Sequence, residues 1–201
     1  MNNKIKIFDL GSNTFKQTRN LVDRFNKFGE VVEVHTFEAQ KELALDELTN
    51  LKKDYPQITF IHNNVAVWNE NTNLNFYECK TWGGNFKGGA SLIPHGGSQN
   101  SEVYEYDSPI LTTAINFTEY FEKHSDKNMY IFIKMDIEGA EYVVLPDLLK
   151  STSFTNLNEL ACEWHSNMYR NDNDMRKKFV SSEREIKNKL IQQKIRLSRW
   201  F

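Results

Sequence analysis

The chain is poor in the residues that staple small proteins or carry proteins into membranes. It has two cysteines in 201 residues, Cys79 and Cys162, and neither belongs to a Cys-x-x-Cys pair. A disulfide framework and a structural zinc site are therefore both disfavoured. No apolar run has the length of a signal-peptide core or a membrane-spanning helix. We expect a protein of a reducing, cytoplasmic compartment with no membrane partner.

An excess of basic residues is also absent. The formal net charge is −2 and the pI is about 6.2, whereas proteins that neutralise phosphates usually have a basic face or a high pI. Nucleic acid is therefore a disfavoured partner. The length fits a single domain over residues 1–201, which is long enough to bury a sizeable core.

What the chain does have is a regular alternation of two kinds of segment. Apolar, strand-like segments alternate with amphipathic, helix-like ones, which predicts an α/β fold with a mostly parallel central sheet and helices on both faces. Strands are predicted over residues 4–10, 30–37, 58–67, 130–133, 157–164 and 194–200, with an inserted strand over 74–77. Helices are predicted over 14–27, 40–53, 139–145 and 173–193, with a further helix start at Asn116. Pro146 should kink or end the helix before it, because proline lacks the backbone N–H that a helix needs.

The segment over residues 130–141 combines a buried strand with several charged side chains. Its sequence is Tyr-Ile-Phe-Ile-Lys-Met-Asp-Ile-Glu-Gly-Ala-Glu, and the four leading residues are typical of a strand covered on both faces. In open α/β sheets, ligands bind beyond the carboxyl ends of such strands. We therefore expect Lys134, Asp136 and Glu138 to stand at the rim of a cleft.

The first two strands also end in acidic residues. The first leads into Asp9-Leu-Gly-Ser-Asn13, where Gly11 lets a bound cofactor approach the backbone closely; a helix cap is the alternative interpretation of this turn. The second ends at Glu38, where a nucleotide-binding sheet presents a carboxylate to two ribose hydroxyls. A dinucleotide fingerprint would have further glycines at Asn13 and Lys16. Their absence indicates a ligand without a pyrophosphate.

Taken together, these segments resemble the FkbM-type S-adenosylmethionine-dependent methyltransferases, which have the class I Rossmann-like fold. The resemblance rests on Phe8-Asp9-Leu10-Gly11-Ser12-Asn13, Phe37-Glu38-Ala39, Asn63-Asn64-Val65-Ala66-Val67, Gly89-Ala90-Ser91-Leu92 and Ile133-Lys134-Met135-Asp136-Ile137-Glu138-Gly139-Ala140-Glu141. It implies S-adenosylmethionine as the cofactor, bound by Asp9, Gly11, Ser12, Asn13, Glu38, Asn64, Val65, Asp136 and Glu138. By this resemblance Asp9, Gly11 and Asn13 would hold the methionine part, Glu38 the ribose, and Asn64 with Val65 would flank the adenine. One departure is Phe15, where the family often has glycine.

Members of this family typically methylate hydroxyls of sugars or natural products. A hydroxyl is a weak nucleophile at neutral pH, so a base or a metal ion is expected near the transferred methyl group. The candidates for this role are Lys134, Asp136, Glu163 and His165. Strand alternation puts Glu163 and His165 on one side, where a carboxylate can orient the imidazole as a base, and it aligns Lys134 with Asp136 as an ion pair.

A metal ion is the less favoured interpretation of the same residues. Asp136, Glu163 and His165 form an oxygen-rich set that suits Mg²⁺ or Mn²⁺. No spacing in the sequence fixes the geometry of such a site, so we assign no metal ligands.

The acceptor is expected in a long glycine-rich segment over residues 80–107. Six of the nine glycines lie there, together with aromatic residues that include Trp82 and Tyr106. Aromatic faces next to polar side chains suit a carbohydrate ring, and long loops are often functional; packing between strands is the alternative. Glu141 is a further candidate for acceptor binding, its alternatives being a helix cap or a pair with a surface lysine.

The sequence therefore predicts an S-adenosylmethionine-dependent O-methyltransferase that acts on a sugar, with a terminal deoxysugar of a glycan as the favoured acceptor. Two alternatives remain open. One is an RNA 2′-hydroxyl methyltransferase that uses Lys134 and Asp136, and the other is a non-catalytic module that binds cofactor or glycan. A class I sheet usually continues with one more strand, so we also consider a domain cut from a larger glycan-assembly protein with a fused glycosyltransferase.

Overall fold

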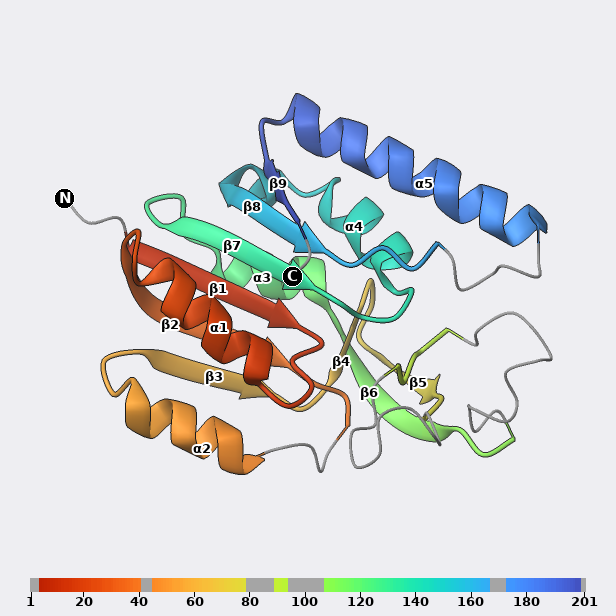
Figure 1. The fold of residues 1–201 in the computed structure, drawn as a ribbon. Helices are drawn as coiled ribbons and strands as arrows, with labels where there is room; N and C mark the ends of the chain where they lie inside the picture. Colours follow the sequence, from red (N-terminus) through yellow and green to blue (C-terminus); the bar gives the residue numbers. More distant parts are fainter. Residues whose placement is uncertain (1–3, 41–44, 79–88, 94–106, 167–172, 200–201) are drawn as a thin grey trace.

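The computed structural model of the protein describes residues 4–40, 45–78, 89–93, 107–166 and 173–199. The strands are β1 (Lys4–Leu10), β2 (Glu30–Phe37), β3 (Thr59–Asn63), β4 (Ala66–Trp68), β5 (Thr72–Phe76), β6 (Ile110–Asn116), β7 (Tyr130–Met135), β8 (Leu157–Cys162) and β9 (Arg196–Ser198) (Figure 1). The helices are α1 (Lys16–Phe25), α2 (Leu45–Asp54), α3 (Phe117–His124), α4 (Glu141–Leu148) and α5 (Asn173–Gln192), with a short 3-10 helix, η2 (Thr152–Asn156). Trp82 and Tyr106, the predicted acceptor-binding aromatics, lie outside the described residues.

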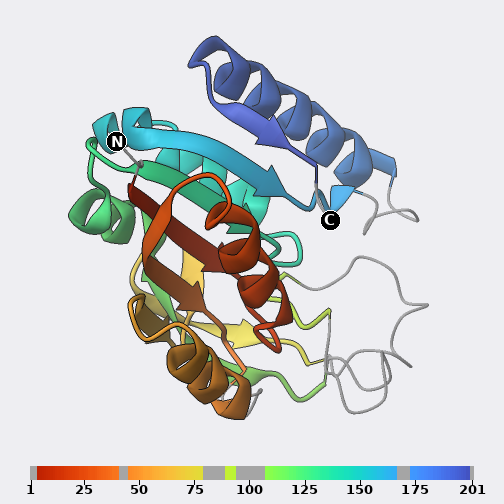
Figure 2. The ribbon, with the colours of Figure 1, turned by 60° about the vertical axis from the view of Figure 1, so that its left-hand side comes forward.

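The larger of two sheets is all parallel and confirms the predicted fold class. Its strand order is β3-β2-β1-β7-β8-β9. Helices α1 and α2 cover one face, and α3, α4 and α5 cover the other (Figures 1 and 2). This is the Rossmann-like arrangement. Since β2, β1 and β7 are neighbours, the residues that follow these three strands meet at one edge of the sheet.

The central strands are apolar on both faces because helices cover both. Along β1, Ile5 and Ile7 pack in the cluster under α1 and α2, whereas Phe8 and Leu10 pack in the cluster under α3, α4 and α5. β7 is buried from Ile131 onwards in the same way. Such double burial is typical of parallel sheets and explains the continuous apolar runs. Because the strands are held on both faces, the loops that follow them begin at fixed positions.

The predicted strand over residues 58–67 is wrong in its second half. β3 ends at Asn63, and Ala66–Trp68 forms β4 in a second sheet with the order β4-β6-β5. Asn64 lies at the break, where its Nδ2 donates a hydrogen bond to the backbone oxygen of Glu38 at 2.8 Å. β5 confirms the inserted strand, although it begins and ends earlier than predicted.

Strand β6 was not predicted from the sequence. Its pattern runs against the rule that apolar residues face inward, since Leu111 is 67% exposed and Thr112 is buried. The helix start predicted at its end is confirmed, because the Oδ1 of Asn116 accepts a hydrogen bond from the backbone N–H of Glu119 at 3.2 Å. This is the usual N-cap geometry.

Two further boundaries correct the prediction. α4 continues through Pro146 to Leu148, and hydrogen bonding resumes after the proline, because the N–H of Leu149 donates to the oxygen of Leu145 at 2.9 Å. Of the two effects predicted for Pro146, a kink or an end of the helix, the end at Leu145 is therefore wrong.

The second correction concerns β8, which ends at Cys162. Glu163 and His165 lie in the connection after the strand. Strand alternation is therefore the wrong reason for expecting these two side chains on one side.

In the part of the chain that the structure describes, no helix has the length and apolarity that a membrane crossing requires.

Candidate functional site

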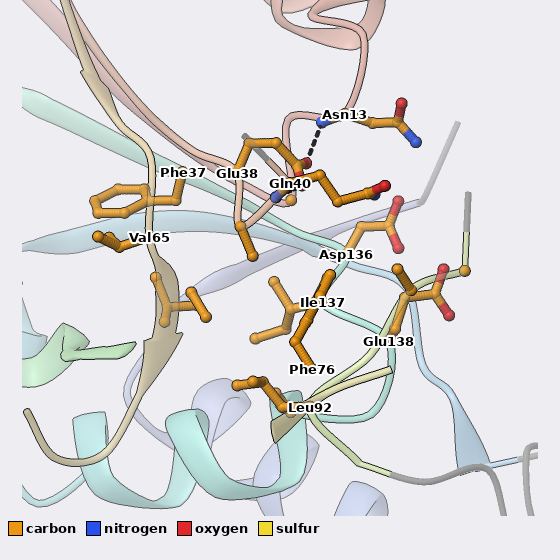
Figure 3. Close-up of a pocket in the computed structure, with 17 residues that line it drawn as sticks. Asn13, Phe37, Glu38, Gln40, Val65, Phe76, Leu92, Asp136, Ile137 and Glu138 are labelled. Atoms are coloured by element: carbon orange, nitrogen blue, oxygen red, sulfur yellow. Dashed lines mark hydrogen bonds between the residues drawn. The ribbon is translucent and has the colours of Figure 1, made fainter. Parts of the chain in front are cut away.

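A pocket opens where β1, β2 and β7 end, and it has an apolar end and an acidic end. In Figure 3, Phe37 and Val65 lie at one end, whereas Asp136 and Glu138 lie at the other. The residues that line it are Gly11, Asn13, Phe37, Glu38, Ala39, Gln40, Val65, Ala66, Val67, Phe76, Gly89, Ala90, Leu92, Asp136, Ile137, Glu138 and Ala140. Of the nine predicted cofactor-binding residues, the wall contains Gly11, Asn13, Glu38, Val65, Asp136 and Glu138.

The turn after β1 is locked to the ends of both neighbouring strands. The N–H groups of Gly11 and Ser12 donate to the backbone oxygen of Phe37 at 2.9 and 3.0 Å, and the N–H of Asp136 donates to the oxygen of Leu10 at 3.1 Å. Gly11 has φ +75°, which a glycine adopts without strain. These bonds fix the three strand ends against one another.

Asp9 and Lys134 form a buried support beneath this turn. Lys134 Nζ lies 3.1 Å from Asp9 Oδ1 and 3.8 Å from Asp136 Oδ2, and it donates to the backbone oxygen of Gly11. Thr18 Oγ1 donates to Asp9 Oδ2 at 2.5 Å. The side chain of Asp9 is fully buried and that of Lys134 is 2% exposed. Both therefore hold the turn from behind, and neither belongs to the pocket wall.

Two other predicted cofactor residues also lie behind the wall. Ser12 is buried, and its Oγ donates to the backbone oxygen of Asp9 at 2.9 Å. Asn64 holds the backbone of Glu38, as described above, and its Nδ2 also donates to the oxygen of Gln40 at 3.3 Å. Their contacts are those of residues that shape the loops around a ligand.

Glu38 is the buried carboxylate of the pocket wall. Its Oε2 accepts a hydrogen bond from the N–H of Asn13 at 2.8 Å (Figure 3), and its Oε1 accepts one from the N–H of Gln40 at 2.9 Å. Burial raises the pKa of this carboxyl, and the two N–H groups oppose that rise. Each oxygen keeps a further lone pair. The pair of oxygens can therefore accept hydrogen bonds from two adjacent hydroxyls of a ligand.

The loop after β7 is shaped by a second buried carboxylate, Glu141. Its Oε1 accepts from the N–H of Ile137 at 3.0 Å and its Oε2 from the N–H of Gly139 at 2.8 Å. Glu138 and Gly139 have φ +53° and +100° within this loop. Glu141 has no exposed surface, so the interpretation as a cap fits its place, and a pair with a surface lysine does not.

Glu141 also holds His165 from the next connection. Its Oε1 lies 2.9 Å from His165 Nδ1. The other ring nitrogen, Nε2, lies 3.4 Å from Glu138 Oε2, 3.8 Å from Asp136 Oδ1 and 4.0 Å from Glu163 Oε1. The structure thus brings Asp136, Glu163 and His165 together, and it adds Glu138 as the nearest carboxylate to Nε2.

The charges of this cluster change the protonation of its members. Burial raises the pKa of Asp136 to about 6, against the charge of Lys134, and burial raises that of Glu138 to about 7, against the charge of His165. For His165, burial lowers the pKa, but the hydrogen bond and charge of Glu141 and the charge of Glu138 outweigh it and raise the pKa to about 9. His165 is thus cationic at neutral pH, and the carboxylates have the capacity to accept a proton.

Several wall residues were missed from the sequence. Gln40, Phe76, Leu92 and Ile137 were assigned no site role, although Leu92 and Ile137 lie in segments that carried the family resemblance. Ser91 anchors that segment, because its Oγ donates to the backbone oxygen of Glu138 at 2.6 Å. Nothing in the sequence indicates that Phe76 lines the pocket, because its position depends on how β5 pairs in the second sheet.

A search of protein-family models finds the methyltransferase FkbM domain over residues 9–189. The chain belongs to this family. The FkbM domain is a methyltransferase domain, and its members use S-adenosylmethionine. A search of curated proteins gave no significant match, and neither did a search of solved structures.

The pocket of this FkbM domain has the chemistry that its cofactor requires. Phe37 and Val65 lie together at the apolar end of the pocket, where an adenine ring would pack (Figure 3). Glu38 has two carboxylate oxygens that would accept hydrogen bonds from ribose hydroxyls, and Asn13 with Asp136 lies toward the acidic end, where the methionine part would be held (Figure 3). The residues present therefore fit the group.

Proposed function

We propose that this domain is an S-adenosylmethionine-dependent O-methyltransferase that acts on a hydroxyl of a sugar, with a terminal deoxysugar of a glycan as the favoured acceptor. The observation that carries the proposal is the acidic end of the pocket, where Asp136 and Glu138 meet His165. A cofactor whose ribose is held by Glu38 would extend its methionine part toward this end. The acceptor would then meet the carboxylates directly.

The bound cofactor supplies a methyl group on a positively charged sulfur, which leaves as a neutral thioether. The residues of the chain orient the reactants and accept a proton. Asp136 or Glu138 would accept the proton that the acceptor hydroxyl loses as its oxygen takes the methyl group. With pKa values of about 6 and 7, both carboxylates suit general-base catalysis near neutral pH.

His165 supports this chemistry as a cation. Its ring is held at Nδ1 by Glu141, so that Nε2 faces the carboxylates at 3.4 Å and 3.8 Å. The positive charge reduces the repulsion between Asp136 and Glu138. It thereby keeps a second carboxylate close to the acceptor, where each can accept a hydrogen bond from a sugar hydroxyl.

The RNA alternative needs a lysine at the acceptor, and the described contacts do not support it. Lys134 is 2% exposed and is engaged with Asp9 and the backbone oxygen of Gly11. A non-catalytic module has no supporting observation either, since the chain belongs to a methyltransferase family and its pocket carboxylates are in place.

The test is a methylation assay with labelled S-adenosylmethionine and a panel of aryl glycosides, including deoxysugars, beside an RNA oligonucleotide. We expect label in one or more glycosides, with the methyl located on a hydroxyl oxygen by mass spectrometry. Asp136→Asn, which keeps the shape of the side chain, should lower turnover by roughly 10²-fold, and Glu119→Gln on the surface of α3 is the matched control. Label in RNA alone, or on an amine, would contradict the proposal.

A further inference from the structure

The acidic end of the pocket has the donor set of a divalent-cation site. Asp136, Glu138 and His165 each offer one ligand atom, and the three atoms lie within 4.8 Å of one another. His165 Nε2 is 3.4 Å from Glu138 Oε2 and 3.8 Å from Asp136 Oδ1. Adjacent ligands of an octahedral ion are about 3 Å apart at the usual bond lengths. Shifts of about 1 Å would therefore bring these atoms to one ion.

The histidine distinguishes this set from an ordinary group of acidic residues. Its Nδ1 is hydrogen-bonded to the fully buried carboxylate of Glu141, which is itself fixed by the N–H groups of Ile137 and Gly139. In metal-free protein Nε2 holds a proton, which a bound ion would displace. The carboxylate at Nδ1 would keep the other N–H and orient Nε2 toward the ion. Glu141 is outside the ligand set and has no exposed surface.

The surroundings of Nε2 also favour a cation. Glu163 Oε1 lies 4.0 Å from it, in addition to the two nearer carboxylates, so three carboxylates face one ring nitrogen. Asp136 and Glu138 line the pocket, and their side chains are 24% and 23% exposed. A cation bound there would remain open to water and to an acceptor on the pocket side.

We propose that Asp136, Glu138 and His165 bind one divalent cation, Mn²⁺ or Mg²⁺, and that Glu141 is the positioning residue for its histidine ligand. Two carboxylates and no thiolate favour these ions, because hard oxygen donors with open positions for water suit them. The site differs from the set expected from the sequence, since Glu138 takes the place of Glu163.

The role of the ion rests on the proposed function, whereas its binding does not. A cation at this place would coordinate the acceptor hydroxyl oxygen and lower the pKa of that hydroxyl. The two ligand carboxylates would then be less basic. With the ion bound, Glu163, whose side chain is 41% exposed beside the ligands, would replace Asp136 and Glu138 as the carboxylate that takes the proton.

The binding is tested on the full chain after treatment with chelator, without S-adenosylmethionine or acceptor. Mn²⁺ is titrated by electron paramagnetic resonance, which measures the free ion, and nitrogen coupling is measured on the bound ion. We expect one Mn²⁺ per chain, with a ¹⁴N coupling that is lost in His165→Asn. Mg²⁺ should compete for the same place.

The variants separate the ligands from their neighbours. Asp136→Asn, Glu138→Gln and His165→Asn should each weaken Mn²⁺ binding by at least 10-fold, and Glu141→Gln should weaken it by about 10-fold to 100-fold, as loss of an orienting partner does. Glu163→Gln should keep the Kd within about 3-fold, since Glu163 is outside the set. Circular dichroism checks that every variant is folded.

Two outcomes overturn the inference, and both differ from a failure of the proposed function. Absence of saturable binding by the folded wild type overturns it, as does binding that persists unchanged in Glu138→Gln and His165→Asn. Full methylation of a glycoside by metal-free protein would overturn only the catalytic role given to the ion, and it would leave the proposed function intact. Mn²⁺ binding at this site without methylation of any sugar would support the cation site and contradict the proposed sugar acceptor.

Discussion

A Cβ atom placed on Gly11 would lie 1.8 Å from the backbone carbonyl oxygen of Asp136. The turn after β1 and the loop after β7 are therefore in contact at a point where only glycine fits. Gly11 also has φ +75°, so two independent constraints apply to the same residue. The contact sets the distance between the part of the pocket around Glu38 and the acidic end.

We predict that Gly11→Ala will destabilise the protein and abolish cofactor binding. Backbone strain and overpacking together should lower the free energy of unfolding by about 2–4 kcal/mol. Urea unfolding measures the stability, and the shift in melting temperature with S-adenosylhomocysteine measures binding. Gly29→Ala is the control, because Gly29 is not among the glycines with positive φ. Equal effects of the two substitutions would contradict the prediction.

Glu38→Gln should weaken cofactor binding by about 10-fold to 100-fold, because hydrogen bonds to a charged group contribute about 1.5–3 kcal/mol. The amide nitrogen of the variant cannot accept from the N–H of Asn13 or Gln40, nor from a ribose hydroxyl. Isothermal titration calorimetry with S-adenosylhomocysteine gives the Kd. The control is Glu47→Gln, whose carboxylate pairs with Arg19 between α1 and α2. Stabilisation of the wild type by NADH instead of the methyl donor would contradict the cofactor assignment.

In metal-free protein, the His165 ring should titrate with a pKa of about 9, and Glu141→Gln should move that pKa toward the usual 6.5. Because the pKa is raised by folding, the charged form stabilises the folded state fully below pH 6.5, and this contribution is lost as the pH rises toward 9. NMR of the imidazole signals measures the titration directly. A pKa that stays near 9 in Glu141→Gln would show that the other carboxylates hold the charge.

His35, a buried histidine of β2 that packs against α3, should make the protein less stable at low pH. His35 is fully buried, its Nδ1 lies 2.8 Å from Tyr120 Oη, and its Nε2 lies 2.5 Å from Glu33 Oε1. Burial lowers the pKa of His35 to about 4, although the hydrogen bond to Glu33 opposes it. Lys6 and His124 also face this group and lower its pKa further.

The sign follows from the lowered pKa. Between pH 6.5 and 4 the histidine is protonated in the unfolded chain but neutral in the folded protein. The free energy of unfolding therefore falls as the pH is lowered, by up to about 3 kcal/mol from this one group. Urea unfolding at several pH values should therefore show a steeper loss for the wild type than for His35→Gln. The difference between the two proteins isolates His35 from the other titrating groups. Identical slopes would contradict the lowered pKa.

The large sheet was predictable because the information lies in short stretches of sequence. β1 and β7 are continuous apolar runs, and a strand buried on both faces leaves few other interpretations. The rule that ligands bind beyond the carboxyl ends of parallel strands pointed to one edge of the sheet, where Glu38, Asp136 and Glu138 line one pocket. Lys134, expected at the same rim, lies behind the pocket wall.

The remaining features depend on contacts between distant segments. Strand alternation predicts the side of β7 on which Lys134 lies. It does not reveal that the turn at Gly11 covers this side chain. Glu141 receives its partners from a loop whose backbone includes two left-handed residues, and no periodicity reveals such a loop. In β6 the apolar Leu111 is exposed and the polar Thr112 is buried. This reversal of the usual pattern is why the strand was not predicted.

The pocket wall is divided between two separately hydrogen-bonded sheets. In the described part of the chain, β4, β5 and β6 pair with one another, whereas β1, β2 and β7 pair within the large sheet. The register of a strand is set by its own partners, so residues inserted between β5 and β6 leave the spacing of Glu38 and Asp136 unchanged. Within the described residues, the two sides of the pocket are therefore joined through few contacts, among them the hydrogen bond from Ser91 Oγ to the backbone oxygen of Glu138. Substitutions in β4 and β5 should therefore change the lining of the pocket while the three strand ends of the large sheet keep their places.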